Sequence, residues 1–549
     1  MAVTPSANRN ILVTSALPYA NGNIHLGHLV EYIQTDIWVR FQRMRGHRCY
    51  YMCADDTHGT PIMISANKQG IRPEELITHM HAQHLRDFTA FRISFDDYYS
   101  TNSEENRELA EFIYLQAKEK DAIYEKEIQQ YFCEKDNLFL PDRMIKGKCP
   151  SCHATEQYGD SCEACSAIYE PTRLGEPYCA ICGTKPKLRS SVHHYFKLSA
   201  FTEELKKWTS AGHIRPEVQN KLQEWFTQGI KDWDISRDAP YFGFRIPGTK
   251  DKYFYVWLDA PIGYIATTKH WCRTHGHDFD QIWHGNTFEI HHFIGKDILY
   301  FHTLFWPAML LVSGFSTPTR VNVHGFLTIN GEKMSKSRGT FINASDYLAH
   351  LDPEFLRYYY AAKLGPGLDD LDLNLDDFTV RINSDVLGKV INIGSRLGKI
   401  VNEKLSHELS QPDAAGSLMI EEIRSALPVI AEYYETLEYN KAMREIMLLA
   451  DKVNKYINDA APWERVLTDT ARATAVCTAG LQGLVILAGM LKPVLPRIVE
   501  GVENFLEIPP LTWENLAQET PLKHIKPYEH LASRIPPGKA HQLIAGTSV

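Results

Sequence analysis

Two short motifs in this 549-residue chain contain side chains that could act on a polyphosphate. The first, His25-Leu26-Gly27-His28, places two imidazoles three positions apart. The second, Lys333-Met334-Ser335-Lys336-Ser337, lies far along the chain and combines two lysines with two serine hydroxyls. A closing loop could bring such groups to the charge that develops on a leaving pyrophosphate. Together the two motifs indicate chemistry on ATP.

The segments around the first motif are expected to position its histidines at a phosphate site. Residues 11–15 are typical of a buried strand, and residues 17–22 form a glycine-containing turn. An apolar stripe then predicts one helix closed by Gly46, with Leu26, Leu29, Ile33, Ile37, Phe41 and Met44 on its buried face. Both histidines fall in the first turn of this helix, beside free backbone N–H groups and the positive end of the dipole. Gly27 leaves room for a flat adenine.

Each motif alone also has a simpler interpretation. A His/Gly tetrapeptide can be surface decoration, and a lysine run is usually a solvated basic loop. The strand, turn and helix around the first motif weaken that interpretation. The second motif follows the apolar run 321–329 and a turn at Asn330-Gly331, so we expect a mobile loop that emerges from strands.

Longer motifs carry a resemblance to a known family. They are Ala16-Leu17-Pro18-Tyr19-Ala20-Asn21-Gly22, Cys53-Ala54-Asp55-Asp56-Thr57-His58-Gly59-Thr60, Trp233-Asp234-Ile235-Ser236-Arg237, Tyr255-Val256-Trp257-Leu258-Asp259-Ala260-Pro261, Phe293-Ile294-Gly295-Lys296-Asp297 and Ala461-Pro462-Trp463. With the histidine and lysine motifs, they resemble the class I aminoacyl-tRNA synthetases, and within that class the methionyl-tRNA synthetases. The resemblance extends over almost the whole chain.

Composition limits the kinds of activity and location. A formal charge of −9 argues against general polyanion binding, so any contact with tRNA should be a local patch. The first ten residues lack an apolar signal core, which predicts a cytoplasmic protein. Residues 473–491 carry no charge, but their threonines, glutamine and glycines favour a buried bundle helix over a membrane span. We therefore expect no membrane association.

The length of the chain predicts several domains. Alternating helices and strands at the start, including a strand over 49–54 and helices over 73–91 and 104–120, indicate an α/β fold with a doubly wound parallel sheet. We expect that sheet to resume at 252–257 and 288–294. Amphipathic stretches at 385–405, 420–437 and 440–457, with the charge-free run, predict an all-α bundle.

The resemblance gives these domains their expected identities. They are the first half of a Rossmann-like catalytic domain over 1–120, an insertion with zinc knuckles over 121–245, the second catalytic half over 246–325, a lysine-loop and stem-contact region over 326–389, an anticodon-binding helical bundle over 390–535 and a tail over 536–549. We expect no further domain after the bundle, and by resemblance this predicts a monomer.

Cysteine spacing predicts a structural metal site. Cysteines in a cytoplasmic chain should not pair as disulfides, and Cys149, Cys152, Cys162 and Cys165 form two Cys-x-x-Cys knuckles. Four thiolates suit tetrahedral zinc, so at least one Zn²⁺ per chain is expected. A second site is possible, because some relatives carry two knuckles. Its candidate ligands are Cys133, Asp136, Cys179 and Cys182, with a carboxylate in place of a fourth thiolate.

The resemblance implies activation of L-methionine with ATP, followed by transfer of methionine to tRNA(Met). A flexible thioether is best held by aromatic and aliphatic walls. The implied methionine site contains Leu17, Tyr19, Asp56, Trp257, Pro261, Tyr264, Ile298 and His302, with Asp56 on the amino group. The implied ATP site contains Asn21, Gly27, Arg237, Gly295, Asp297 and Lys336, with Mg²⁺ accompanying ATP. The implied catalytic residues, which stabilise charge, are His25, His28, Lys333 and Lys336.

Three residues near the end of the chain could read unpaired bases. Asn392 and Arg396 are four apart on one predicted helical face, and Trp463 follows Ala461-Pro462 at a helix boundary. An indole can stack on a base while the polar side chains bond to base edges. A half-buried tryptophan that pins two helices is the alternative. The resemblance favours contact with the CAU anticodon.

Two other functions compete with this interpretation. A synthetase for leucine, isoleucine or valine would ordinarily carry an editing domain of roughly 200 residues, a whole domain's length. The insertion here is shorter and consists largely of knuckles. A non-catalytic, zinc-containing RNA-binding protein would not need both the histidine and the lysine motif complete.

Overall fold

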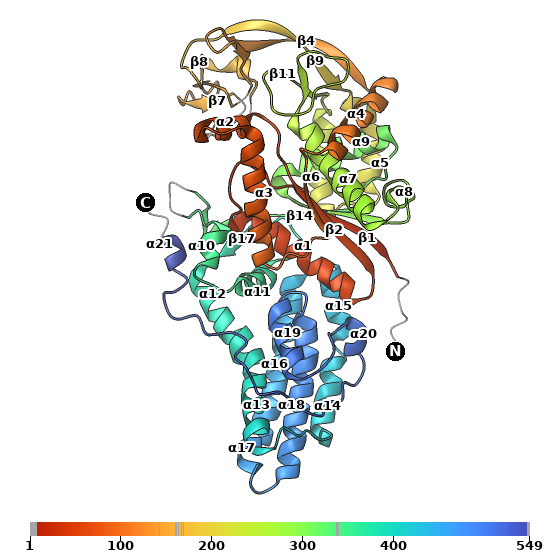
Figure 1. Cartoon of the computed structure of the whole chain (residues 1–549), viewed down its shortest axis with the longest axis vertical. Coiled ribbons are helices and arrows are strands. Elements are labelled where there is room, and N and C mark those ends of the chain that lie inside the picture. Colours follow the sequence, from red (N-terminus) through yellow and green to blue (C-terminus); the bar gives the residue numbers. More distant parts are fainter. Residues whose placement is uncertain are drawn as a thin grey trace.

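A computed structural model describes residues 8–141, 143–159, 162, 164–165, 167, 169–335 and 340–545. Figure 1 shows an elongated molecule, with an insertion at the top, a sheet covered by helices in the middle and a helical bundle at the bottom.

The central sheet has five parallel strands in the order β14-β13-β1-β2-β3. Their bounds are β1 Asn10–Ser15, β2 Arg48–Asp55, β3 Asp97–Ser100, β13 Glu289–Gly295 and β14 Arg320–His324. Because β1 pairs with both β2 and β13, the strand order reverses there and opens a crevice at the carboxyl ends of β1 and β13. The prediction of a Rossmann-like, doubly wound sheet is confirmed.

Alternating side chains of β1 face two different cores, as a sheet covered on both sides requires. Ile11 and Val13 pack in the cluster that contains α1, whereas Leu12 packs with α4, α7 and α9. The helices of this part are α1 Leu26–Met44, α2 Thr60–Gln69, α3 Pro73–Ala90, α4 Glu104–Glu119, α7 Val256–His275, α8 Phe279–Trp283 and α9 Trp306–Ser313. The expected helices α1, α3 and α4 are confirmed, and α2 was not foreseen.

The insertion contains an antiparallel sheet in the order β10-β9-β4-β5 and a small sheet in the order β7-β6-β8. Its elements are β4 Ile123–Cys133, β5 Leu138–Phe139, β6 Ile145–Lys148, β7 Gln157–Tyr158, β8 Gly175–Cys179, β9 Lys187–Phe196, α5 Thr202–Ser210, α6 Pro216–Gln228 and β10 Trp233–Asp234. One prediction was wrong: β12 (Lys252–Phe254) pairs antiparallel with β11 (Ser236–Asp238), outside the parallel sheet. The aromatic run there is too short for a central strand, because α7 begins at Val256.

The predicted turn before the lysine motif is a two-residue hairpin. It joins β15 (Leu327–Ile329) to β16 (Glu332–Lys333), and β17 (Leu371–Leu373) pairs with β15 on its other side. Asn330 and Gly331 both have positive φ, 49° and 78°. Such turns match the twist of the two strands, and Asn-Gly is the pair that adopts them most readily. Lys336 lies outside the described residues.

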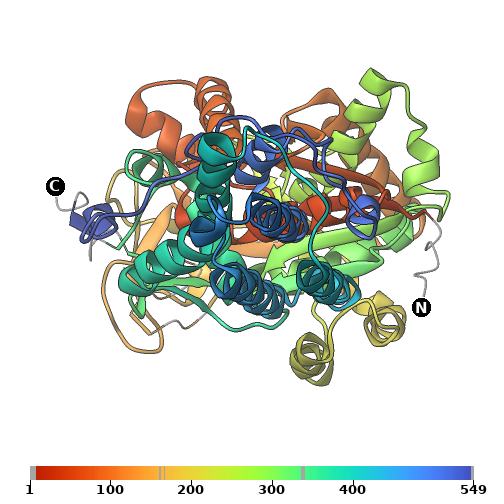
Figure 2. The same ribbon diagram turned by 90° about the horizontal axis from the view of Figure 1, so that it is seen from below.

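The C-terminal half is helical, and Figure 2, seen from below, shows the long helices of the bundle end-on in front of the sheet. It contains α10 Ala344–Leu348, α11 Pro353–Lys363, α12 Leu375–Arg381, a π-helical stretch Ile382–Ile391, α13 Asn392–Lys404, α14 Ala414–Arg424, α15 Leu427–Glu435, α16 Tyr439–Ala460, α17 Pro462–Arg465, α18 Thr470–Leu491, α19 Pro496–Phe505, α20 Trp513–Leu516 and α21 Gln542–Ala545. The expected single stretch 420–437 is two helices, because Pro428 starts a new helix at α15.

Helix α18 is long and apolar enough to cross a membrane, but it is mostly buried among the other helices of the bundle. The predicted buried bundle helix is therefore confirmed. The tail also packs against the protein. Ala540 and Leu543 are buried, and His541 Nε2 lies 2.8 Å from Asp376 Oδ1 of α12.

Candidate active site and metal centres

The two histidines of the first motif cap α1 and use each other to do so. His25 is the N-cap residue, and its Nδ1 accepts a hydrogen bond from the His28 backbone N–H at 3.3 Å. Nδ1 of His28 accepts from the His25 N–H at the same distance. Because both Nδ1 atoms accept, each neutral ring carries its proton on Nε2. Burial and the neighbouring His25 hold the pKa of His28 well below its usual value, so this imidazole is a neutral donor.

Gly27 is needed for this pairing. A Cβ at this position would lie 3.0 Å from two ring atoms of His25 and 3.4 Å from the sulfur of Met334. The glycine therefore lets the lysine-motif segment approach the histidines. Lys333, in the same segment, lines the same cavity as His25 and His28.

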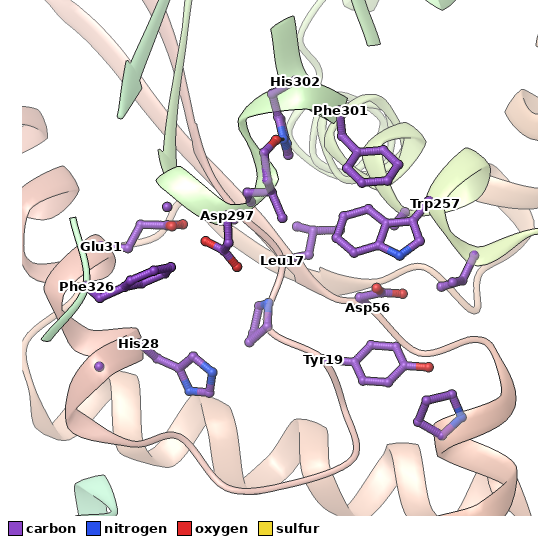
Figure 3. Close-up of a pocket in the computed structure, with 18 of the residues that line it drawn as sticks. Leu17, Tyr19, His28, Glu31, Asp56, Trp257, Asp297, Phe301, His302 and Phe326 are labelled. Carbon is purple, nitrogen blue, oxygen red and sulfur yellow. Dashed lines mark hydrogen bonds between the residues drawn. The ribbon is translucent and has the colours of Figure 1, made fainter. Parts of the chain in front are cut away.

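A cavity of about 940 Å³ opens at the carboxyl ends of β1 and β13, where the strand order predicts it (Figure 3). Most of the predicted site residues line it: Leu17, Tyr19, His25, Gly27, His28, Asp56, Arg237, Trp257, Pro261, Tyr264, Gly295, Asp297, Ile298, His302 and Lys333. Asn21 is exposed and is not among the residues that line the cavity. Lys336 lies outside the described part of the chain.

One end of the cavity has apolar and aromatic walls. The ring of Trp257 stacks on Phe301, with centroids 4.3 Å apart. His302 is neutral, because burial lowers its pKa to about 4. Its Nδ1 lies 3.1 Å from the Ile298 carbonyl, which can only accept, so Nε2 accepts the Tyr264 hydroxyl proton at 2.8 Å. A neutral, hydrogen-bonded wall suits an uncharged thioether.

Asp56 is the acidic group beside this apolar end. It follows β2, where its backbone bridges to Tyr19 across the crevice. The side chain is 8 % exposed, and its Oδ1 has no hydrogen-bond partner among the described residues. Burial, with the charge of Asp259 second, raises the pKa of Asp56 well above its usual value. A cation placed here would compensate this carboxylate and restore its charge.

The other end of the cavity carries the groups suited to a nucleotide. A Cβ on Gly295 would lie 2.5 Å from Asp297 Oδ1, so glycine is required for the carboxylate to fold back over the strand end. Arg237 lies apart from these two residues, on the Tyr19 side of the cavity, where its guanidinium is 3.8 Å from the centre of the Tyr255 ring and donates to the Ser236 carbonyl at 2.7 Å. These contacts hold a cation at the edge of the cavity.

Sequence reasoning missed several residues of the cavity. Glu31, in the second turn of α1, is buried there and lies 3.3 Å from His324 Nε2. Its position three residues after His28 was a usable signal, because both then lie on one helical face. Phe301, Phe326 and Arg143 also line the cavity. They come from separate elements and carried no local pattern that joined them.

The first cysteine cluster has the geometry of a tetrahedral metal site. The Sγ atoms of Cys149, Cys152, Cys162 and Cys165 all lie within 4.8 Å of one another. Two of their separations are 3.8 and 3.5 Å. Four sulfurs about 2.3 Å from one zinc ion would be about 3.8 Å apart, so the cluster fits zinc.

The second cluster brings Cys133, Asp136, Cys179 and Cys182 together, with one ligand atom from each within 4.8 Å of the others. Asp136 Oδ2 lies 3.2 Å from Cys133 Sγ and 3.1 Å from Cys179 Sγ. β4 and β8 end at these two cysteines, so the strand ends of two different sheets meet here. A carboxylate is an accepted zinc ligand, and this donor set also fits.

Two of the three bundle residues, Arg396 and Trp463, contact each other at the end of the bundle that is remote from the sheet. The Arg396 guanidinium lies 5.0 Å from the Trp463 ring centre and donates to Asn458 Oδ1 at 3.0 Å. Trp463 is 41 % exposed. Asn392 lies one turn before Arg396 on α13. Figure 1 shows α17, which carries Trp463, near the lower tip of the molecule.

Comparisons with known proteins agree with this architecture. A family model described as tRNA synthetases class I (M) matches residues 11–398, and one for the anticodon binding domain of methionyl tRNA ligase matches 408–534. A methionine–tRNA ligase of Thiobacillus denitrificans is 54 % identical over 542 residues, which are 98 % of this chain and 78 % of that protein. The fold and the paired motifs thus define a class I aminoacyl-tRNA synthetase. Within that class, the chain belongs to the methionyl-tRNA synthetase family.

Solved structures share the fold. Two structures of Mycobacterium tuberculosis methionyl-tRNA synthetase, both with methionyl-adenylate, match with TM-scores of 0.78 and 0.77 at 24 % and 22 % identity. They cover 95 % of this chain in each case, and 99 % and 100 % of their own chains.

Proposed function

We propose that this protein is a methionine–tRNA ligase, which acts on L-methionine, ATP and tRNA(Met). A methionine carboxylate oxygen attacks the α-phosphorus of ATP, the bond to the β-phosphate breaks, and pyrophosphate leaves. The terminal adenosine hydroxyl of the tRNA then attacks the methionyl carbonyl and releases AMP. The observation that carries the proposal is that one cavity joins the histidine pair to a neutral apolar pocket with the buried carboxylate of Asp56.

In this proposal the apolar end of the cavity binds methionine. Asp56 holds the ammonium group, which supplies the cation that the buried carboxylate lacks. The residues around the thioether are Leu17, Tyr19, Trp257, Pro261, Tyr264, Ile298 and His302. A neutral His302 adds polarity without charge, which a thioether tolerates.

The other end binds ATP with its Mg²⁺. The Nε2 protons of His25 and His28 donate to phosphate oxygens as negative charge develops, so these rings act as neutral donors. Gly27, Gly295 and Asp297 accommodate the nucleoside, and Arg237 binds phosphate. Lys333 and Lys336 meet the leaving pyrophosphate. The assignment of Asn21 and Lys336 rests on the motifs alone.

Zinc is proposed at both clusters. Cys149, Cys152, Cys162 and Cys165 would hold one ion, and Cys133, Asp136, Cys179 and Cys182 a second. Bound zinc supplies folding free energy to a segment with a small apolar core. The bundle residues Asn392, Arg396 and Trp463 are proposed to contact the anticodon. The domain boundaries, the cytoplasmic location and the monomeric state stay predictions.

The test is exchange of labelled pyrophosphate into ATP, measured with each of the twenty amino acids. We expect exchange that depends on methionine and is far weaker with leucine, isoleucine and valine. Strong exchange with another amino acid would reassign the substrate. No exchange with any amino acid, in a folded protein that binds RNA, would favour a non-catalytic role.

A further inference from the structure

A buried charged cluster lies at the carboxyl end of β2, its members do not line the cavity, and the proposed reaction does not use it. Its centre is Asp55, the last residue of β2, whose side chain is fully buried. Asp55 Oδ1 accepts from His84 Nδ1 at 2.6 Å and from the Tyr98 hydroxyl at 2.5 Å. Oδ2 accepts from His81 Nδ1 at 2.7 Å. Burial would raise the pKa of Asp55, but these hydrogen bonds outweigh it and lower the pKa.

His84 connects this cluster to the turn before the histidine pair. The ring lies on α3, is fully buried and places Nε2 2.8 Å from the carbonyl oxygen of Gly22. A carbonyl can only accept, and so can the ionised Asp55. Both ring nitrogens therefore face acceptors, and only the doubly protonated imidazolium makes both hydrogen bonds.

The Gly22 turn sets the position of α1. Residues 21–23 are exposed, so side-chain packing does little to fix them. His25, the N-cap of α1, follows three residues after Gly22. On the far side of the turn, the Ala344 N–H donates to the Ile24 carbonyl at 2.8 Å. The turn is thus held between the lysine-motif side of the protein and His84.

We propose that His84, held as an imidazolium by Asp55, is a positioning residue that fixes the Gly22 turn and thereby aims the histidine pair at ATP. This rests on the proposed adenylation reaction. Asp55 and Asp56 then have separate tasks on consecutive residues. Asp56 serves the amino acid, and Asp55 organises the phosphate side through His84.

The arrangement predicts a pH dependence. The charged or titratable groups that face His84 are Asp55 on β2, Tyr98 on β3, His81 and Asp87 on α3, and His28 on α1. Burial would lower the pKa of His84, but Asp55 outweighs burial and raises it. The imidazolium is complete below that raised pKa. As pH rises through it, one proton is lost, and only one of the two hydrogen bonds can survive.

His81 provides a matched control, because it contacts the same carboxylate through the same ring atom one turn earlier on α3. We would compare His84→Gln with His81→Gln in methionine-dependent pyrophosphate exchange. For His84→Gln we expect kcat/KM for ATP to fall roughly tenfold to a hundredfold, the effect of displacing a reacting group by about 1 Å. Methionine affinity in equilibrium dialysis should stay nearly unchanged. His81→Gln should match the wild type, with thermal unfolding confirming that both variants fold.

Asp55→Asn supplies a second test, on the pH profile. Without the negative charge of Asp55, the strongest influence that raises the pKa of His84 is gone, burial weighs more, and the pKa falls. The alkaline loss of kcat/KM for ATP should therefore move to lower pH in Asp55→Asn and stay unchanged in His81→Gln. An unshifted profile, or an equal loss of ATP and methionine affinity in His84→Gln, would overturn the positioning role. Failure of the wild type to exchange pyrophosphate with methionine would instead overturn the proposed function.

Discussion

At the scale of single residues, the two ends of the cavity differ in how charge is handled. The phosphate end has neutral imidazoles whose tautomers are fixed by backbone hydrogen bonds. The amino-acid end has the buried Asp56 carboxyl, whose pKa is raised by burial and whose Oδ1 has no hydrogen-bond partner among the described residues. A site that buries such a group to bind a cation sacrifices stability for affinity.

We therefore predict that Asp56→Asn stabilises the protein without substrate while it abolishes tight methionine binding. The gain should be about 1 kcal/mol near neutral pH, the usual size of such a relief. Because the pKa of Asp56 is raised on folding, its ionisation favours the unfolded state as pH rises above the ordinary value of 3.8. The stabilisation should vanish in acid and grow with pH.

Thermal unfolding across pH, with fluorescence titration of methionine, measures both effects. Asp278→Asn is a suitable control, because Asp278 is an exposed helix N-cap that does not line the cavity, and because asparagine caps a helix about as well, its stability should stay nearly unchanged. A lower unfolding temperature for Asp56→Asn at neutral pH would contradict the prediction.

At the scale of elements, the insertion depends on its knuckles. Three turns are each closed by a hydrogen bond of the same type. In each, the backbone N–H of a cysteine (Cys149, Cys162 or Cys179) donates to the carbonyl five residues later, at 2.9 Å. The apolar cluster around them is small and includes four of the cysteines themselves, at Cys133, Cys149, Cys162 and Cys179. We therefore expect bound metal to provide much of the local stability.

We predict two zinc ions per chain, one lost in Cys149→Ser and the other lost in Cys179→Ser. Metal analysis of the purified proteins gives the stoichiometry, and limited proteolysis reports the loosened insertion. Cys272→Ser is the control, since that thiol is buried outside both clusters and should leave the zinc content unchanged. Unchanged zinc in Cys179→Ser would confine metal to the first cluster.

At the scale of the whole molecule, α1 joins the active site to the bundle. Its start carries the histidine pair, and the C-terminal half contacts it along its length. Tyr360 donates to the Leu26 carbonyl and Tyr439 to the Gln34 carbonyl, each at 2.9 Å. At its centre, Arg357 and Asp36 form a fully buried ion pair at 2.7 Å. Arg357 also donates to the Val494 carbonyl of the bundle at 2.8 Å.

We predict that Asp36→Asn destabilises the protein by about 3–5 kcal/mol at neutral pH, because Arg357 is left buried and unpaired. Burial would raise the pKa of Asp36, but Arg40 and Arg357 outweigh it and lower the pKa to about 2. The stability that Asp36 contributes is therefore present above pH 3.8 and lost as pH falls toward about 2. The difference between wild type and variant should shrink over that range.

Denaturant unfolding at several pH values tests this. Asp96→Asn breaks a half-exposed pair with Arg43 and should cost far less, about 1 kcal/mol or under. If the two variants lost equal amounts of unfolding free energy, the buried pair would contribute no more to stability than the partly exposed one.

The bundle prediction concerns its remote end. Trp463→Ala should raise the KM for tRNA or strongly reduce aminoacylation, because an unpaired base loses its stacking surface, worth about 1–3 kcal/mol. Pyrophosphate exchange without tRNA should remain almost intact, since α17, which carries Trp463, lies near the lower tip of the molecule, away from the sheet whose strand ends border the cavity (Figure 1). Leu467→Ala, a change at a nearby and highly exposed side chain, is the control. The anticodon role is falsified if both activities fall together.

The sequence by itself determined the elements whose signals are local. The apolar stripe from Leu26 to Met44 specified α1, and the Asn330-Gly331 pair specified the hairpin before the lysine motif. Cys-x-x-Cys spacing specified the first metal cluster, because knuckle geometry lies within a few residues. The long motifs also predicted most of the cavity residues, since most of these motifs lie where a strand ends or a helix begins beside the cavity.

Only the tertiary structure decided what depends on contacts between distant segments. Strand 252–254 has the composition of a core strand, yet it pairs with β11 because the parallel sheet is completed by β13 and β14. The second metal cluster required β4 and β8 to end side by side. Residue spacing alone does not encode side-chain directions or which distant segments become neighbours in the folded chain. Three features depend on them: the mutual capping of His25 and His28, the exposed position of Asn21, and the hydrogen bond between His84 and Gly22.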